Sequence, residues 1–310
     1  MRCLRCGLDA VFRRAYSGEG LCRSHFLNSV ESRVYTTVKQ HQMLTPTETI
    51  ALALSGGKDS TSLLHMLVKI ERRFPKARLV AVTVDEGIKG YRDEAVRIAA
   101  ENCAKLGVEH RLVSFLQLYG FTLDSIVEKA RARGSRLTPC TYCGVLRRKA
   151  LNREAAAVGA TKLATAHNLD DMVQTVVLNL FHGDLWRLSR VEPVTSSPEE
   201  GFVPRIKPLY EMPENEVALY AYLRDIEFQR SPCPYAGSSL RTEMRAIVNR
   251  MEAEHPGVKF TLLRTFEKVR PAIAEAQERA PRLNACKGCG DPTIAELCMP
   301  CQMLAEIGLH

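Results

Sequence analysis

Ten of the eleven cysteines fall into three sets, and two of these sets have the spacing of a closed metal site. One reads Cys-x2-Cys-x15-Cys-x2-His near the N-terminus, and the other reads Cys-x2-Cys-x8-Cys-x2-Cys near the C-terminus. Four such ligands complete the tetrahedron of a zinc ion, which is a structural arrangement. The predicted zinc ligands are therefore Cys3, Cys6, Cys22 and His25 at one end, and Cys286, Cys289, Cys298 and Cys301 at the other.

The third set has three members, the pair Cys140 and Cys143 and the distant Cys233. Three thiolates leave one position of a metal centre open, which suits chemistry better than structure. The remaining cysteine, Cys103, lies on the apolar face of a predicted helix, where a buried core thiol is expected.

A glycine-containing loop follows the first apolar strand and opens a helix: Ser55-Gly56-Gly57-Lys58-Asp59-Ser60. Glycines let backbone N–H groups turn toward an anion, and the helix N-terminus adds its positive end. The Gly-x4-Gly-Lys spacing of a Walker A loop is absent. A glycine turn that merely caps the helix is the alternative, but six such residues at this position favour binding of a polyphosphate.

Two further polar segments end predicted strands, Asp85-Glu86-Gly87 and His167-Asn168-Leu169-Asp170-Asp171. Ligands bind at the carboxyl ends of strands in parallel sheets. Asp59, Asp170 and Asp171 either hold Mg²⁺ beside the polyphosphate or cap a helix, and Asp171 is predicted to lie nearest the chemistry. His167 contacts nucleotide or RNA, or is a satisfied histidine at a strand end.

Strands and helices alternate through the centre of the chain, which predicts an α/β fold with a parallel, doubly wound sheet. The expected strands are 50–54, 79–84, 111–115 and 162–166. The expected helices are 61–72, 91–106, 146–158 and 170–181, with another over 214–224 and basic helices beyond Leu240. Five segments are predicted: an N-terminal zinc finger (1–28), a linker helix (29–48), a nucleotide-binding core (49–185), a helical part that completes the site (186–283) and a C-terminal zinc finger (284–310).

The composition of the chain is that of a globular protein with a basic surface. Its 310 residues carry a formal net charge of +8, and no apolar run approaches the twenty residues of a membrane span. The first residues lack the apolar core of a signal peptide, so a cytoplasmic location with reduced cysteines is expected. The positive charge is compatible with an RNA partner.

Arginines and lysines flank the proposed sites, although such runs are often only solvated surface. We expect phosphate contacts most of all beside the Cys140 pair. The basic side chains considered are Arg2, Arg5, Arg13, Arg14, Arg23 and Lys287 in the fingers, Arg131, Arg133, Arg136, Arg147, Arg148 and Lys149 near the pair, and Arg205, Lys207, Arg241, Arg245 and Arg250 in the second half.

The loop 55–60 looks like the PP-loop, SGGxDS, of ATP pyrophosphatases, which release pyrophosphate and transfer AMP to a substrate oxygen. With it, several segments across nearly the whole chain resemble the cytoplasmic tRNA 2-thiolation family, the tRNA 2-thiouridine synthetases of archaea and eukaryotes. These segments are 85–93, 139–144, 167–171, 233–235 and both fingers. Ala166 departs from the family pattern, since many relatives have glycine before the histidine.

The resemblance implies cofactors and roles for particular residues. ATP and Mg²⁺ bind at Ser55–Ser60, with Asp59 and Asp171 in catalysis and Asp85 at the adenosine. A [4Fe–4S] cluster binds the catalytic cysteines Cys140, Cys143 and Cys233 and presents sulfide to the adenylated uridine. Persulfide chemistry on one cysteine, or a zinc ion, are the alternatives.

The resemblance also implies partners. These are tRNA, a ubiquitin-like sulfur carrier or free sulfide as donor, and a second copy of the chain in a homodimer. Wobble position 34 is slightly favoured over position 54. Three other functions compete with this one. A cytidine 32 thiolase generally lacks paired terminal fingers, and another PP-loop ligase, such as a lysidine synthetase or amidating enzyme, needs no central cysteines. The third is a zinc-finger RNA-binding protein with an inert nucleotide site.

Overall fold

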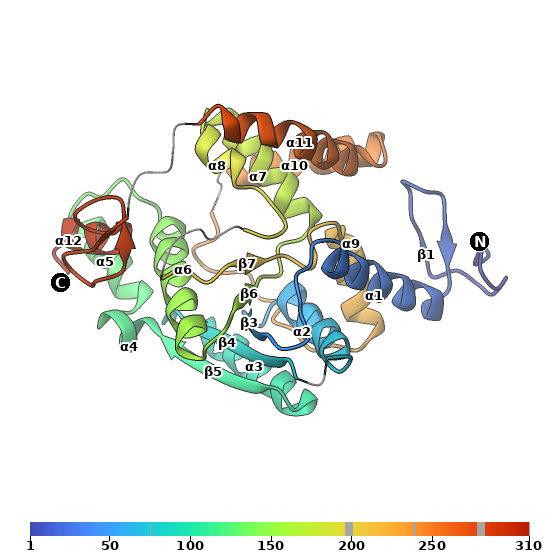
Figure 1. Cartoon of the computed structure of the whole chain (residues 1–310), viewed down its shortest axis with the longest axis horizontal. Coiled ribbons are helices and arrows are strands. Elements are labelled where there is room, and N and C mark those ends of the chain that lie inside the picture. The colour runs from blue at the N-terminus through green and yellow to red at the C-terminus, as the bar shows by residue number, and fades with distance from the viewer. Residues whose placement is uncertain (75, 196–200, 238–239, 278–282, 310) are drawn as a thin grey trace.

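A five-stranded parallel sheet forms the centre of the computed structural model, which describes residues 1–74, 76–195, 201–237, 240–277 and 283–309. Along the sheet the strands lie in the order β5 (Glu109–Ser114), β4 (Arg78–Asp85), β3 (Thr49–Ala53), β6 (Lys162–Ala164) and β7 (Arg205–Ile206) (Figure 1). All four neighbouring pairs are parallel. The predicted doubly wound α/β class is therefore confirmed.

The chain adds strands first on one side of β3 and then on the other, so the direction of strand addition reverses between β3 and β6. From β3 the chain moves outward to β4 and β5, and it then returns to the other side of β3. At such a switch point the loops that follow the two strands diverge and leave a crevice. The loop after β3 begins with Ser55, and the loop after β6 contains His167, so this crevice is where both predicted segments meet.

Helices cover both faces of the sheet. On one face lie α2 (Lys58–Glu71) and α3 (Arg92–Leu106), backed by α1 (Arg23–Gln40) and α9 (Glu214–Leu223), and α6 (Pro139–Ala157) covers the other. Alternation along β3 explains this arrangement, because Ile50 and Leu52 face the α1–α2 core while Ala51 faces α6. The buried thiol of Cys103 belongs to the first of these cores, as predicted.

A separate helical layer packs beyond the sheet edge. It contains α7 (Leu169–Phe181), α8 (Leu185–Ser189), α10 (Leu240–Glu254) and α11 (Val258–Glu275) around a core of their own (Figure 1). Parts of the predicted helical segment 186–283, namely 196–200, 238–239 and 278–282, lie outside the described residues. None of the described helices combines the length and hydrophobicity of a membrane span.

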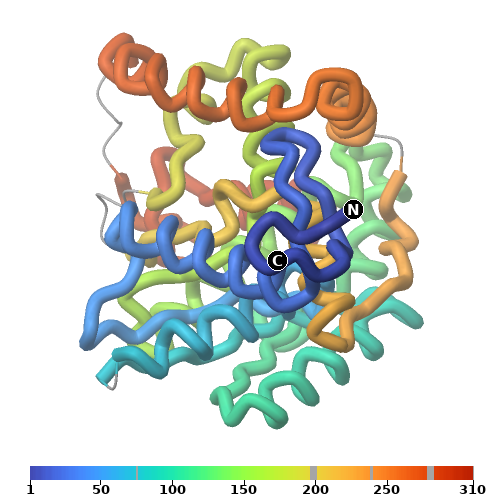
Figure 2. Tube along the Cα trace, turned by 90° about the vertical axis from the view of Figure 1, so that its right-hand side faces the viewer, coloured from blue at the N-terminus to red at the C-terminus, as the bar shows by residue number. Residues whose placement is uncertain are grey.

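The two cysteine-rich termini lie at opposite ends of the molecule (Figure 1). The N-terminal one contains the hairpin of β1 (Phe12–Arg13) and β2 (Gly20–Leu21) and is nearest the viewer in Figure 2. The C-terminal one contains β8 (Asn284–Ala285), β9 (Pro292–Thr293) and α12 (Met299–Glu306).

Several predicted boundaries were wrong. The linker helix begins within the finger at Arg23 and ends at Gln40, and α2 begins at Lys58 rather than residue 61. The helix predicted over 146–158 begins at Pro139, because Thr138 caps it and proline suits its first turn. The sequence interpretation also missed β7, α8 and two helices before α6, which are α4 (Phe115–Tyr119) and α5 (Leu123–Ala132).

Candidate functional site

The loop after β3 is built to leave the N-terminus of α2 available to an anion. Ser60 holds the turn closed, since its hydroxyl accepts from the Ser55 amide at 3.2 Å and donates to the Gly57 carbonyl at 3.1 Å. Gly57 is the N-cap residue, and no side chain caps the helix. The first backbone N–H groups of α2 therefore remain available for a phosphate.

Gly56 is required by both its conformation and its surroundings. Its φ is +83°, in the left-handed region, and a Cβ at this position would lie 2.5 Å from the carbonyl oxygen of Ala95 on α3. The close approach of two backbones fixes the loop against α3.

Lys58 sits between two carboxylates. Its ammonium donates to Asp59 at 2.7 Å and to Glu214 at 2.8 Å, and together they raise the pKa of Lys58 against the opposing effect of burial. Burial raises the pKa of Asp59, and the positive charge of Lys58 offsets only part of this increase. Glu214, from α9, was not identified from the sequence, because its partner lies 156 residues earlier.

The two aspartates that open α7 have different surroundings. Asp170 is buried, forms an ion pair with Lys259 and accepts the Glu214 amide at 2.8 Å, which is a structural role. Asp171 caps its own helix with one oxygen, which accepts from the Asn168 amide at 3.2 Å. Burial raises the pKa of Asp171, and the charge of nearby Asp59 raises it further. Asn168 links the two carboxylates, since its side-chain amide donates to Asp59 at 3.4 Å and its backbone N–H donates to Asp171 at 3.2 Å.

A cavity of about 330 Å³ occupies the crevice between β3 and β6. Its walls include Ser55, Asp59 and His167. Burial lowers the pKa of His167 to about 4, and nearby cations, Lys207 first among them, add to this shift. The imidazole is therefore neutral at neutral pH, and its Nδ1 lies 2.9 Å from the Thr165 hydroxyl.

Asp85 does not line this cavity, although its neighbour Glu86 does. The Asp85 carboxylate instead accepts from the Gly87 amide at 2.8 Å within the turn after β4. Glu86 is buried and faces two arginines, Arg92 at 2.6 Å and Arg147 at 3.4 Å. The sequence interpretation did not single out Glu86 or Arg92, and the role of Asp85 at adenosine stays a prediction.

The central cysteines gather beside the glycine loop. Cys143 and Cys233 line a cavity of about 190 Å³ together with Ser55, Gly57 and Arg147. The Cys140 thiol lies 3.6 Å from the carbonyl oxygen of Tyr235, two residues after Cys233. Burial raises the pKa of the Cys143 thiol to about 11, and the charge of Arg147 partly counteracts this.

The spacing of these three sulfurs differs from that of the terminal sets. Among the described residues, two groups keep all their ligand atoms within 4.8 Å of one another, and the central trio is in neither of them. Tetrahedral zinc with bonds of about 2.3 Å needs sulfurs about 3.8 Å apart. The three central sulfurs are thus less closely grouped than the ligands of either finger, and a cluster would place its cysteines on different irons.

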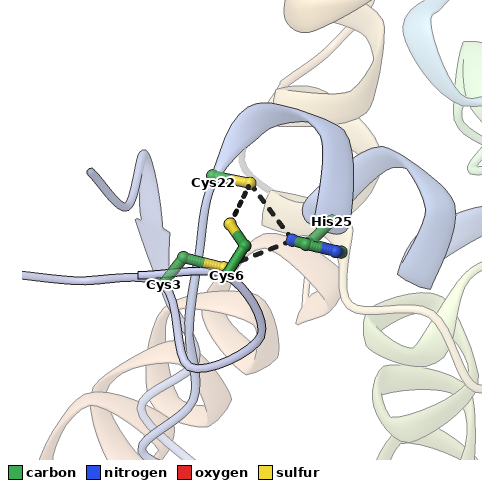
Figure 3. A group of neighbouring side chains, drawn as sticks. All are labelled: Cys3, Cys6, Cys22 and His25. Atoms are coloured by element: carbon green, nitrogen blue, oxygen red, sulfur yellow. Dashed lines mark hydrogen bonds between the residues drawn. The ribbon is translucent and has the colours of Figure 1, made fainter. Parts of the chain in front are cut away.

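Both terminal sets converge as predicted. At the N-terminal set, His25 Nδ1 lies 3.4 Å from Cys3 Sγ and 3.3 Å from Cys22 Sγ, and Cys6 and Cys22 are 3.7 Å apart (Figure 3). At the C-terminal set, Cys289 and Cys298 are 3.6 Å apart. These spacings suit a single ion with N and S ligands.

Some of the basic side chains considered for RNA contact are committed elsewhere. Arg14 is buried, and its guanidinium lies 2.7 Å from Glu216, which is itself inaccessible. Lys149 donates to the Cys289 sulfur at 2.8 Å. Arg245 pairs with Glu214 at 2.7 Å. Because these groups have partners within the protein, fewer basic side chains are available to RNA than the sequence suggested.

Comparisons with known proteins agree with this geometry. A model of the PP-loop domain matches residues 28–251. The chain is 38% identical to the tRNA 2-thiolation protein NcsA of Haloferax volcanii, with 99% of each chain covered. It is 34% identical to the cytoplasmic tRNA 2-thiolation protein 1 of Anopheles gambiae, covering 96% of this chain and 86% of that one.

A solved structure is similar over the same extent. It is the U34-tRNA thiolase NcsA from Methanococcus maripaludis with its [4Fe-4S] cluster. The identity is 33% and the TM-score 0.85, and the match covers 100% of this chain and 97% of the other.

Proposed function

The chain belongs to the PP-loop family of tRNA 2-thiolation proteins and is an ATP-dependent tRNA sulfurtransferase, and we propose that it thiolates the wobble uridine at position 34. The position follows the solved relative described as a U34-tRNA thiolase, and one observation carries the transfer of sulfur within this site. The nucleotide cavity and the cysteine cavity have five wall residues in common: Ser55, Gly57, Glu86, Arg92 and Arg147. A base activated in the first cavity is therefore adjacent to sulfur held in the second.

ATP binds with its polyphosphate over Ser55–Ser60. Lys58 leaves Glu214 for the β- and γ-phosphates, and the N-terminal amides of α2 hold the same oxygens. Asp59 and Asp171 would hold Mg²⁺, whose charge would take the place of the Lys58 charge beside Asp59. These assignments rest on the convergence of Lys58, Asp59 and Asp171 at one end of the sheet.

The uridine O2 attacks the α-phosphorus, the bond to the β-phosphate oxygen breaks, and pyrophosphate leaves. AMP on O2 then becomes the leaving group when sulfur attacks C2. Arg147 lies between the two cavities and supplies positive charge where the α-phosphate must sit. His167, neutral near pH 7, serves as a hydrogen-bonding wall rather than a cation.

The central cysteines fit a [4Fe–4S] cluster better than zinc, because three soft thiolates are less closely grouped than the ligands of either finger. When bound, such a cluster supplies an iron without a protein ligand, which can bind sulfide. Cys143 and Cys233 would hold it from the cavity wall, and Cys140 would hold it from the first turn of α6. Persulfide chemistry at these residues remains the second candidate, since Cys143 faces the same cavity.

We also propose a structural zinc ion in each finger, with fingers over 1–28 and 284–310, a linker over 29–48 that contains most of α1, the PP-loop core over 49–185 and the completing helical part over 186–283. The finger sulfurs have the spacing of a single ion. A cytoplasmic location fits the names of the relatives. A ubiquitin-like carrier or free sulfide as donor, and a homodimer, stay predictions.

The test is anaerobic reconstitution with iron and sulfide, then incubation with ATP and tRNA and mass analysis of position-resolved nucleosides. We expect 2-thiouridine at position 34, with AMP and pyrophosphate released. Serine at Cys140, Cys143 or Cys233 should abolish thiolation while ATP binding persists. Thiolation of iron-free protein from a persulfide donor would favour the second candidate, and product at uridine 54 or cytidine 32 would overturn the substrate assignment.

A further inference from the structure

A larger cavity, of about 910 Å³, adjoins the nucleotide cavity on the side away from the central cysteines. Its walls come from α6, from α8 and from the C-terminal finger, which includes Ile294 and Met299. Arg148 and Arg205 line both cavities and therefore mark the place where they meet. We refer to this larger cavity as the finger groove.

The finger groove is strongly cationic. Its lining includes Arg148, Arg190 and Arg205, whereas its carboxylate Asp291 is already paired with Lys149 at 3.0 Å. Within the described part of the chain, no carboxylate lies within ion-pairing distance of Arg148 or Arg205. Burial lowers the pKa of Arg205, and the positive charge of Arg148 lowers it further. Two neighbouring guanidinium groups without counter-charges are the arrangement expected of a site for a polyanion.

An aromatic side chain lies in the same groove. Trp186 is the only tryptophan of the chain, is half-buried, and carries the guanidinium of Arg190 4.4 Å from its ring centroid. The opposite wall is apolar and exposed, with Ile294 and Met299 from the finger. A flat aromatic surface beside unpaired arginines matches unpaired RNA, whose bases stack while the phosphates seek positive charge.

We propose that the finger groove binds the single-stranded RNA next to the target nucleotide, with one base stacked on Trp186 and phosphates held by Arg148 and Arg205. This inference rests on the proposed function, since it supplies the path by which a tRNA loop reaches the nucleotide cavity. The C-terminal finger then has a role in substrate binding, because it forms one wall of that path.

The single tryptophan makes the proposal directly measurable. An anticodon stem–loop RNA is titrated into metal-loaded protein saturated with a non-hydrolysable ATP analogue, and tryptophan fluorescence is followed. Stacking of a base on Trp186 should quench the emission, with a midpoint equal to the dissociation constant measured by filter binding. An RNA duplex without a loop should not quench it, since its bases are not available for stacking.

Substitutions separate stacking from charge. Trp186→Ala should weaken stem–loop binding about 5- to 100-fold, as expected for one stacked base, while Trp186→Phe largely restores it. Arg148→Ala should lower the slope of log K against log salt by roughly 0.7 for each phosphate that this arginine neutralises. Arg97→Ala removes the same charge from α3, on the far face of the sheet, and should leave binding unchanged.

The outcomes distinguish failure of the groove from failure of the function. If wild-type protein makes 2-thiouridine but Trp186→Ala binds RNA as tightly as wild type, the groove proposal is wrong and the function stands. If a peptide ending in a glycine carboxylate quenches the tryptophan and RNA does not, the groove serves a protein sulfur donor instead. If wild-type protein neither binds nor thiolates tRNA, the proposed function itself fails.

Discussion

Lys149 should control how tightly the C-terminal finger holds the zinc ion proposed there. Its ammonium lies 2.8 Å from Cys289 Sγ and 3.0 Å from an oxygen of Asp291, and its side chain is only 9% exposed. Zinc with four thiolates carries a net charge of −2, so a buried cation at this distance offsets half of it. Lys149 thereby links α6 to the negatively charged thiolates of the finger.

The size of the effect follows from these contacts. Lys149→Met keeps the length and apolar stem of the side chain and removes the charge. A hydrogen bond to a charged group contributes about 1.5–3 kcal/mol, which agrees with the 10- to 100-fold loss of affinity typical of changes just outside a metal's ligands. Arg153 still pairs with Asp291 at 3.1 Å, so the larger penalty of a stranded carboxylate is avoided.

The assay is competition between the protein and a zinc-binding dye, which reports two release phases. The N-terminal site does not contact Lys149 and serves as an internal reference. Lys149→Met should shift one phase by 10- to 100-fold and leave the other unchanged. The control Lys287→Met removes a lysine that is 68% exposed and whose one ion pair among the described residues is with the exposed Glu296, so neither phase should move. Identical release from wild type and Lys149→Met, or an equal shift in the control, refutes this account.

Three other substitutions test the remaining structural claims. Gly56→Ala should reduce kcat/KM for ATP at least about tenfold in a pyrophosphate-release assay, because a Cβ at φ +83° meets the α3 backbone. The control is Gly90→Ala, where φ is +70° but no atom lies within 4 Å of the added Cβ, and it should keep ATP use intact. Glu216→Gln should lower the free energy of unfolding by up to about 3–5 kcal/mol in chemical denaturation, since Arg14 and Arg33 lose their buried carboxylate and Arg14 keeps Glu19 at 2.9 Å. The exposed Glu296→Gln should change it by less than about 0.5 kcal/mol. The pKa of His167 falls from 6.5 to about 4 on folding. Between pH 4 and 6.5 the unfolded chain therefore binds more protons than the folded one, so the stability of the fold rises with pH. His167→Gln should flatten the corresponding rise in the thermal unfolding temperature.

Local signals were sufficient for the framework of the site. The glycine loop located the end of β3 and, within three residues, the start of α2, since the required φ > 0 and the helix N-terminus are encoded within six residues. Strand–helix alternation predicted the parallel sheet, and a parallel sheet alone brings Ser55 and His167 to one edge. The spacing of the finger cysteines predicted which sulfurs converge, because a short loop determines their separation.

Contacts between distant segments were not predictable in this way. Glu214 reaches Lys58 only because α9 packs on α2, and no pattern near either residue reveals that packing. Arg14 looked like a surface cation of a finger, yet it is buried by Glu216, some two hundred residues later. The start of α6 was placed too late even though Thr138 and Pro139 carry a capping signal, since the cysteine pair and Gly144 interrupt the apolar periodicity.

The corrected start of α6 explains why a structural finger lies beside a reactive site. Cys143 and Arg147 are four residues apart, so they share a helix face and both line the cysteine cavity. Lys149 and Arg153 are likewise four apart and face the finger. A shift of one residue in the register of α6 would rotate these faces by about 100° and carry Cys143 out of the cavity. Because the finger contacts Lys149 and Arg153 at once, it opposes that rotation, and under the proposed mechanism the distance between the sulfur and the activated base depends on it.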